Sequence, residues 1–403
     1  MKYSKQEVMQ YVQEEDVKFI RLAFCDVLGI QKNISIMPEE LPRAFEYGIA
    51  IDASAIEGFG DETHSDLLLH PEADTLMSLP WRPEHGRVVR MFCNISYPDG
   101  RIFECDSRSI LKKAIQDAEK SGYQFFFGAE QEFYLFNLDD NGNPTKEPYD
   151  NAGYMDIAPE DRGENIRREI CLTLEQMGIR PESSHHEEGP GQNEIDFRYS
   201  GPLTAADNAM TFQTVVKTVA HRNGLYADFA PKPLDNKPGN GFHINMSVKS
   251  SNNADNMDFM IAGILAKAAD MTVFLNPLES SYERLGNNKA PKYISWSSEN
   301  RSQLVRIPAA EGEYKRAELR SPDPAANSYL AFALMIYASL YGIQNKLKLQ
   351  APSDINLYKA DADILAKLDQ LPEDLESACA VARYSDFIKE HIPSAIRDIY
   401  CNR

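Results

Sequence analysis

The sequence predicts an α+β protein in which a small N-terminal sheet domain precedes a larger domain of intermingled strands and helices. Three observations support this prediction. The chain has 403 residues, which corresponds to about two or three domains at roughly 150 residues each. Strand-like segments dominate before residue 105, and strand and helix patterns alternate from there to about residue 350. We therefore divide the chain into domains 1–105 and 106–403.

The first domain begins with helical spacing over residues 5–16. Residues 17–36 are rich in β-branched and aromatic side chains and are predicted to form two short strands joined at Asp26-Val-Leu-Gly29. Further strands are predicted near residues 88–95 and 101–104, with a Pro-Asp-Gly turn between them. These segments predict one small sheet.

The second domain begins with a capped amphipathic helix over residues 107–122, followed by a long aromatic strand over residues 124–136. The longest apolar run, residues 329–343, is shorter than the ~20 residues needed to span a bilayer, so we expect a core helix there. From residue 357 onward the chain is predicted to form short helices separated by prolines.

Composition restricts the class of partner. Lys and Arg number 42 against 61 Asp and Glu, a formal charge of −19, which argues against nucleic acid or an acidic membrane surface as a partner but leaves small anions open. The six cysteines form no C-x-x-C pair, as is typical of reduced thiols in a cytosolic protein. We therefore expect a cytoplasmic protein without a disulfide framework.

Acidic residues interrupt segments that otherwise have the composition of buried strands. Successive side chains of a strand point to opposite faces, so Glu130 and Glu132 point to the same face of the otherwise largely apolar strand over residues 124–136. Two buried like charges are costly without a cation, although a strand edge facing water would explain this pair equally well. The edge explanation weakens because the pattern recurs in later segments, at Glu187, Glu194, His243 and Glu318.

The chemistry of these groups indicates a metal. Five carboxylates and one imidazole, with no cysteine, suit hard divalent ions such as Mg²⁺ or Mn²⁺ better than structural zinc. Six ligands could hold two ions with three protein ligands each, which leaves positions for water and substrate phosphates. The alternative for His243 is a histidine satisfied within the core.

Arginines cluster in the same part of the chain, at Arg284, Arg301, Arg306, Arg316 and Arg320. In so acidic a chain they indicate bidentate recognition of phosphate or carboxylate, although surface salt bridges are the alternative. Divalent ions and arginines around a cleft together predict phosphoryl transfer from a nucleotide. The chain contains neither a G-x-x-x-x-G-K-[ST] loop nor the kinase motifs, so the nucleotide must be held in another way.

Taken in order, these motifs resemble those of class I glutamine synthetases over almost the whole chain. The motifs are E-x-E, H-H-E with G-Q-x-E-I, G-x-G-x-H-x-x-x-S, N-R-S with R-I-P, and E-x-R-x-P-D-P. The resemblance implies a β-grasp domain followed by a catalytic domain with a curved antiparallel sheet flanked by helices. It also implies two stacked hexameric rings with active sites between subunits, and synthesis of glutamine from glutamate, ammonia and ATP through a γ-glutamyl phosphate.

The same resemblance implies roles for individual residues. The first metal would be bound by Glu132, Glu187 and Glu194, and the second by Glu130, His243 and Glu318. ATP would be contacted by Glu182, Ser247 and Arg316, glutamate by Arg284, Arg320 and the Gly239 backbone, and the transferring phosphoryl group by Arg301 and Arg306. The ammonium site would comprise Tyr154 and, from the adjacent subunit, Asp52.

One position departs from the family pattern. The family's flap carries a glutamate that closes the site and helps to take a proton from ammonium, whereas Arg284-Leu-Gly-Asn-Asn-Lys-Ala-Pro291 carries Lys289 there. A lysine cannot accept that proton and should repel ammonium. The sequence is therefore compatible with a glutamine synthetase of reduced or altered efficiency, with a related ligase whose amine or acid substrate differs, or with a non-catalytic binding protein. The retained metal ligands disfavour the last of these.

Overall fold

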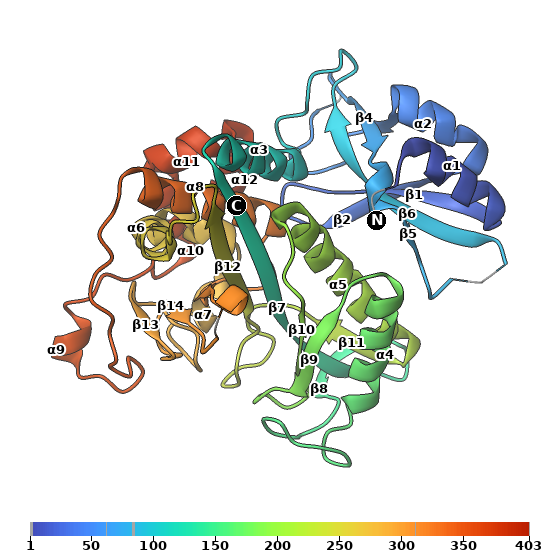
Figure 1. The fold of residues 1–403 in the computed structure, drawn as a ribbon. Coiled ribbons are helices and arrows are strands. Elements are labelled where there is room, and N and C mark those ends of the chain that lie inside the picture. The colour runs from blue at the N-terminus through green and yellow to red at the C-terminus, as the bar shows by residue number, and fades with distance from the viewer. Residues whose placement is uncertain (1–2, 62, 83–84, 311, 403) are drawn as a thin grey trace.

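A computed structural model describes residues 3–61, 63–82, 85–310 and 312–402. Figure 1 shows an N-terminal sheet with its helices beside a larger unit built around a second sheet. The α+β class is confirmed, with helices and strands mixed along the chain. In the part of the chain that the structure describes, no helix has both the length and the apolar character required to cross a membrane.

The first sheet has the strand order β2-β1-β6-β4-β3, with β5 paired to β6. Strands β1 and β6 run parallel, and the other pairs are antiparallel. Its strands are β1 (Val17–Cys25), β2 (Gln31–Ile36), β3 (Ile49–Asp52), β4 (Asp66–Pro71), β5 (Met77–Ser78) and β6 (Arg87–Ser96). The accompanying helices are α1 (Lys5–Glu14), η1 (Pro38–Glu40), α2 (Leu41–Tyr47) and η2 (Ala73–Thr75).

The prediction of a strand over residues 101–104 is wrong. That segment, which the structure describes in full, makes a single isolated bridge between Ser96 and Ile102. Phe103 then turns into the core, and Asp106 accepts a hydrogen bond from the Arg108 amide as the N-cap of the next helix. The chain therefore leaves the sheet before a strand can form.

The second sheet has the order β13-β14-β15-β12-β7-β10-β9, with β8 and β11 pairing to β7. The predicted long aromatic strand is confirmed as β7, which lies at its centre. All pairs are antiparallel except β13 with β14. Its strands are β7 (Tyr123–Leu138), β8 (Pro144–Pro148), β9 (Pro181–His186), β10 (Gln192–Phe197), β11 (Leu225–Asp228), β12 (Phe242–Ser250), β13 (Trp296–Ser298), β14 (Val305–Ile307) and β15 (Ala317–Leu319).

Helices cover the second sheet and form the rest of the core. The apolar run over residues 329–343 lies in a core helix, as expected, because α8 is buried along nearly its whole length against α6. The two helices approach so closely at Gly342 that a Cβ there would lie 2.0 Å from the Phe259 carbonyl oxygen. The helices are α3 (Ser107–Lys120), α4 (Glu164–Gln176), α5 (Pro202–Arg222), α6 (Met257–Leu275), α7 (Glu279–Arg284), η3 (Gly312–Tyr314), α8 (Ser328–Gln344), α9 (Ala362–Leu365), α10 (Leu375–Tyr384), α11 (Asp386–His391) and α12 (Ser394–Cys401).

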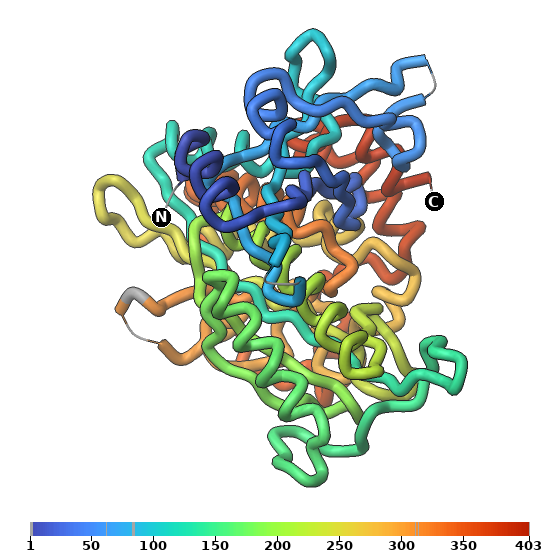
Figure 2. Tube along the Cα trace, turned by 90° about the vertical axis from the view of Figure 1, so that its right-hand side faces the viewer, coloured from blue at the N-terminus to red at the C-terminus, as the bar shows by residue number. Residues whose placement is uncertain are grey.

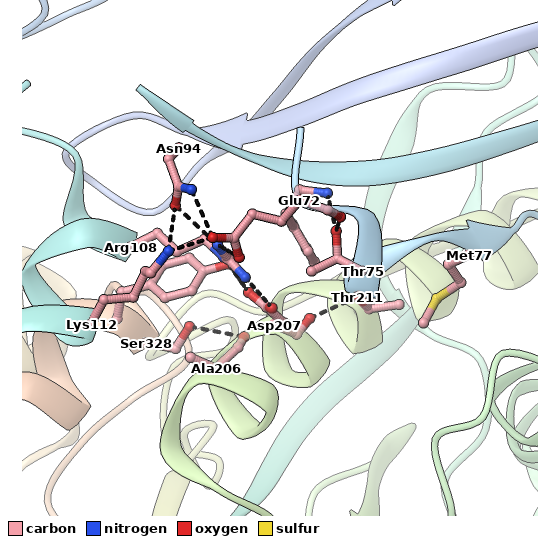
Figure 3. A network of polar contacts seen from close by, with 12 residues as sticks. Glu72, Thr75, Met77, Asn94, Arg108, Lys112, Ala206, Asp207, Thr211 and Ser328 are labelled. Atoms are coloured by element: carbon pink, nitrogen blue, oxygen red, sulfur yellow. Dashed lines mark hydrogen bonds and ion pairs between the residues drawn. The ribbon is translucent and has the colours of Figure 1, made fainter. Parts of the chain in front are cut away.

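A buried ionic network joins the two units (Figure 3). Arg108 on α3 is 3% exposed and donates to Glu72, which follows β4, at 2.6 Å, and to Asp207 on α5 at 2.9 and 3.0 Å. The C-terminal helices make a second junction, where the Tyr400 hydroxyl donates to the Val27 carbonyl at 3.0 Å. Figure 2 shows these helices, drawn in red, beside the blue N-terminal unit. Both junctions fix how the first sheet sits against the second.

Candidate active site

The register of the second sheet brings the predicted acidic residues together on one face. Glu132 on β7 is paired with Glu194 on β10, and Glu130 is paired with both Asp196 on β10 and His243 on β12. Directly paired residues on neighbouring strands have Cβ atoms about 5 Å apart, so these side chains meet. Segments more than a hundred residues apart in the sequence therefore form one acidic cluster.

This cluster lines a cavity of about 640 Å³. Apart from Glu318, all of the predicted metal and glutamate ligands contribute to its wall, together with Tyr154 and the predicted phosphoryl arginines. Glu318 lies directly behind, with its carboxylate 3.9 Å from His243 Nδ1. The predicted residues in the wall are Glu130, Glu132, Tyr154, Glu187, Glu194, Gly239, His243, Arg284, Arg301, Arg306, Arg316 and Arg320.

Two groups of side chains in this cavity could each hold a cation. Ligand atoms of Glu130, Glu194 and His243 all lie within 4.8 Å of one another, and the same is true of His185, Glu187 and Glu194. Such spacing suits a hard divalent ion surrounded by oxygen and imidazole ligands. Both groups contain Glu194 and therefore differ from the predicted ligand sets, in which Glu194 joins Glu132 and Glu187 while Glu130 and His243 join Glu318.

The electrostatics of the cluster fit a cation as well. Burial, together with the neighbouring charge of Glu187, raises the pKa of Glu132 to about 7. Burial and the Glu130 charge raise the pKa of Asp196 to about 7, and burial and the Asp196 charge raise the pKa of Glu194 well above its ordinary value. Carboxylates this close cannot all ionise unless a positive charge lies between them. The donor set therefore fits the predicted Mg²⁺ or Mn²⁺.

A pH dependence follows from these shifts. Each of these carboxyls has a higher pKa in the folded chain, and for Glu132 and Asp196 the stability that the carboxyl contributes is lost as pH rises from about 4 to about 7. Without divalent ions, the melting temperature is expected to fall over this range. Added Mn²⁺ should reverse the fall, giving a stabilisation that is larger at pH 8 than at pH 5. Thermal unfolding in EDTA and in MnCl₂ across this range measures the effect, and a stabilisation independent of pH would contradict it.

Glu318 anchors the arginines on the other side of the cavity. Its side chain is fully buried and accepts hydrogen bonds from Arg306 Nε at 2.5 Å and from Arg320. Arg284, 3% exposed, donates to the Ser321 carbonyl at 2.6 Å. These contacts hold guanidinium groups rigidly at the cavity wall, where they could bind carboxylate or phosphate groups.

A second cavity of about 300 Å³ adjoins the first, and Glu130 lines both. Glu182, Ser247 and Arg316, the predicted ATP ligands, all line it. Asn245 connects it to the acidic cluster, because it donates to Glu130 at 2.6 Å and accepts from Arg316 Nε at 2.8 Å. Aromatic side chains complete the wall, at Phe126, Tyr199 and Tyr314. The mixture of aromatic and polar groups suits a nucleotide base.

The turn between β9 and β10, which carries Glu187, is held by buried polar contacts. His186 is fully buried, with its Nδ1 2.6 Å from the Glu187 carbonyl and its Nε2 2.8 Å from Asp150. Arg167 donates to Asn193 at the start of β10 at 2.6 Å. These partners restrict the position of the turn and hence of the Glu187 carboxylate.

The flap segment closes one side of the larger cavity. Lys289 forms an ion pair with Glu188, and its Nζ lies 5.6 Å from the centre of the Tyr154 ring. The Gly286 amide donates to the Ala290 carbonyl at 2.8 Å, which closes the segment into a tight loop. The lysine is therefore at the site, as the motif predicts, and it is paired with a carboxylate from another element.

Asp52 lies elsewhere. It is exposed at the end of β3 and accepts hydrogen bonds from the amide and hydroxyl of Ser54, at 3.0 and 2.6 Å. It is not among the described residues that line either cavity of its own chain. Its delivery by an adjacent subunit stays a prediction.

Among the titratable residues that line the larger cavity, the sequence did not predict three, His185, Glu188 and Asp196. Asp196 was detectable, because it follows Glu194 by two residues and therefore shares its face of the strand. Glu188 carried no comparable signal. Its side chain meets Lys289 only because two segments 101 residues apart fold against each other.

Comparison with known proteins identifies relatives of both parts of the chain. The glutamine synthetase β-grasp domain model matches residues 16–98, and the glutamine synthetase catalytic domain model matches residues 104–403. The chain is 45% identical to a glutamine synthetase from Methanosarcina mazei over 96% of this chain and 90% of that protein. It is 43% identical to one from Clostridium saccharobutylicum, over 96% of this chain and 91% of that one. Among solved structures, an ADP complex of GmaS superposes with a TM-score of 0.88 at 27% identity, covering 98% of this chain and 94% of that one.

Proposed function

Because this chain belongs to the glutamine synthetase family, a family of ATP-dependent ligases, we propose that it forms glutamine from glutamate and ammonia. One observation carries the proposal: the acidic cluster and the arginines line one cavity, and that cavity shares Glu130 with a second, aromatic-walled cavity. The arrangement suits glutamate and a nucleotide that meet at their reacting ends.

The reaction has two steps. The γ-carboxylate of glutamate attacks the γ-phosphorus of ATP in line, ADP leaves, and ammonia then displaces phosphate from the γ-glutamyl phosphate. Arg284, Arg320 and the Gly239 backbone hold glutamate, while Glu182, Ser247 and Arg316 contact ATP. Arg301 and Arg306 steady the charge on the transferring phosphoryl group. Mg²⁺ or Mn²⁺ held by Glu132, Glu187 and Glu194, and by Glu130, His243 and Glu318, would neutralise phosphate charge.

Ammonium has to lose a proton before it can attack. We propose that Tyr154 faces the ammonium site and that Asp52 of an adjacent subunit completes it. This requires an oligomer in which β3 of one copy reaches the cavity of the next, such as two stacked hexameric rings. The same proposal includes a division of the chain into domains 1–105 and 106–403. It also includes a cytoplasmic location.

A second candidate is a ligase of the same chemistry with another amine or acid substrate. Lys289 favours it, because a positive charge at the acceptor side of the cavity should hinder ammonium and could instead pair with a carboxylate on the acceptor. A catalytically impaired member of the family is the third possibility.

A substrate screen separates these candidates. ATP hydrolysis is measured with Mg²⁺ or Mn²⁺ and glutamate, in the presence of ammonia, hydroxylamine or a set of primary amines. We expect phosphate release with ammonia. Release only with a larger amine would support the second candidate, and nucleotide binding without release for any pair would support the third.

Exchanging the charge of Lys289 tests its role in the acceptor step. Lys289→Glu is expected to raise ammonia-dependent phosphate release by about tenfold or more, because a positioned proton acceptor contributes about 10²–10⁴-fold. Lys292→Glu, three residues further along the same segment, is the control and should leave the rate unchanged. No gain in Lys289→Glu, with ATP and metal binding intact, would contradict the view that Lys289 limits deprotonation.

A further inference from the structure

The flap lysine occupies a cation-binding position formed by residues of two other segments. Its Nζ pairs with the Glu188 carboxylate and lies over the Tyr154 ring, 5.6 Å from the ring centre. A carboxylate and an aromatic face both attract an ammonium group. Since a lysine side chain ends in a primary ammonium, the chain itself shows that this head group fits between Glu188 and Tyr154.

This position belongs to the reaction cavity. Glu188, Tyr154 and Lys289 all line the 640 Å³ cavity. The Tyr154 ring packs edge-on against His185, with 5.4 Å between ring centres, and His185 contacts Glu187 at 2.9 Å. A cation held here therefore lies beside the acidic cluster and in contact with solvent, because the Lys289 and Glu188 side chains are 52% and 39% exposed.

The ion pair is suited to exchange. The Lys289 and Glu188 side chains are 52% and 39% exposed, and exposed ion pairs of this kind contribute little to stability. The flap backbone is held independently, because Asn288 donates to the Lys237 carbonyl at 3.1 Å and Gly286 to the Ala290 carbonyl at 2.8 Å. The lysine side chain can therefore move into solvent while the loop stays in place.

We propose that Glu188 is the acceptor-binding carboxylate of this chain and that Lys289 is a resident cation which the incoming ammonium displaces. The proposal rests on the proposed function and specifies that the acceptor binds as the ammonium cation. It also accounts for the lysine in the flap: the negative charge at the acceptor side comes from the β9–β10 turn, at Glu188. Lys289 pairs with the Glu188 carboxylate until the acceptor displaces it.

Steady-state kinetics with two acceptors test the proposal. Ammonium carries the charge that Glu188 would bind, whereas hydroxylamine is uncharged at neutral pH and serves as the matched nucleophile. Glu188→Gln is expected to raise KM for ammonium about fivefold, as expected for loss of one exposed charge contact, with kcat within about twofold. Lys289→Gln should lower KM for ammonium by a similar factor, because the competing cation is gone. KM for hydroxylamine should stay unchanged in both variants.

Two further variants and one binding measurement complete the design. Glu160→Gln removes an exposed charge and Lys292→Gln removes a partly buried one, both outside the cavity, and both variants should behave as wild type. Equal rises in KM for ammonium and hydroxylamine in Glu188→Gln, or no rise in either, would overturn the proposal. Absence of turnover with both acceptors in wild type would overturn the proposed function instead. In that case the melting temperature of the protein loaded with nucleotide and Mn²⁺ is compared in ammonium chloride and in sodium chloride. A stabilisation by ammonium chloride that Glu188→Gln abolishes supports the Glu188 site. Any other result contradicts the site.

Discussion

Glu318→Ala is expected to lower the free energy of unfolding by about 3–5 kcal/mol and to abolish ATP-dependent ligation. The Glu318 side chain is fully buried and is the shared acceptor for Arg306 and Arg320. Without it, two largely buried guanidinium groups lose their counter-charge, which is the costly way to break a buried ion pair. The same change removes a carboxylate 3.9 Å from His243, at the proposed second metal position.

Urea denaturation and Mn²⁺ titration measure the two parts of this effect separately. Glu318→Gln keeps the side-chain volume and should fold, yet bind Mn²⁺ at least about tenfold more weakly, because an amide replaces a charged ligand. Glu376→Ala, an exposed glutamate in the first turn of α10, serves as the control for loss of a single acidic side chain. Wild-type Mn²⁺ affinity in Glu318→Gln would contradict its assignment as a ligand.

Arg108→Ala is expected to cost a similar amount, about 3–5 kcal/mol, through loss of the contact between the two units. Arg108 bridges Glu72 in the first unit and Asp207 on α5, and Lys112 also pairs with Glu72 (Figure 3). Burial opposes ionisation of Glu72, yet the Arg108 charge and the Lys112 hydrogen bond lower its pKa to about 2. Removing Arg108 leaves Asp207, another carboxylate in this network, without its cation.

The matched control is Arg43→Ala, because Arg43 pairs with Glu40 at 2.9 Å while its side chain is 63% exposed. An exposed pair contributes about 0–1 kcal/mol, so this variant should stay close to wild type. Chemical denaturation followed by circular dichroism compares the two. Equal costs for Arg108→Ala and Arg43→Ala would contradict the view that the buried network holds the units together.

The pattern of apolar residues was sufficient to predict those helices and strands whose surroundings are the same along their whole length. Residues 329–343 are apolar throughout, and a continuous apolar segment of that length packs as a buried helix whatever its neighbours are. The strand over residues 101–104 failed for the opposite reason. Its residues suit a strand, but Asp106 caps α3 and takes the chain out of the sheet. Local propensity does not include that competition.

Some features of the candidate site could likewise be predicted from the sequence, and others could not. Alternation in β7 places Glu130 and Glu132 on one face, since the side-chain period of a strand is two wherever the strand lies. The order of motifs was enough to recognise the family. The action of Asp52 at the site of an adjacent subunit stays a prediction, as does the domain boundary at residue 105.

The amino-acid sequence alone determined the α+β class, the family and the chemical types of the site residues. These depend on periodicity and on the order of motifs. Strand register and loop contact decide the rest. Register pairs Glu130 with both Asp196 and His243, and loop contact brings Glu188 to Lys289. The sequence gives the type of each charged residue, but packing between distant segments decides which opposite charge that residue contacts. For this reason the lysine in the flap is an anomaly in the sequence and one half of an ion pair in the structure.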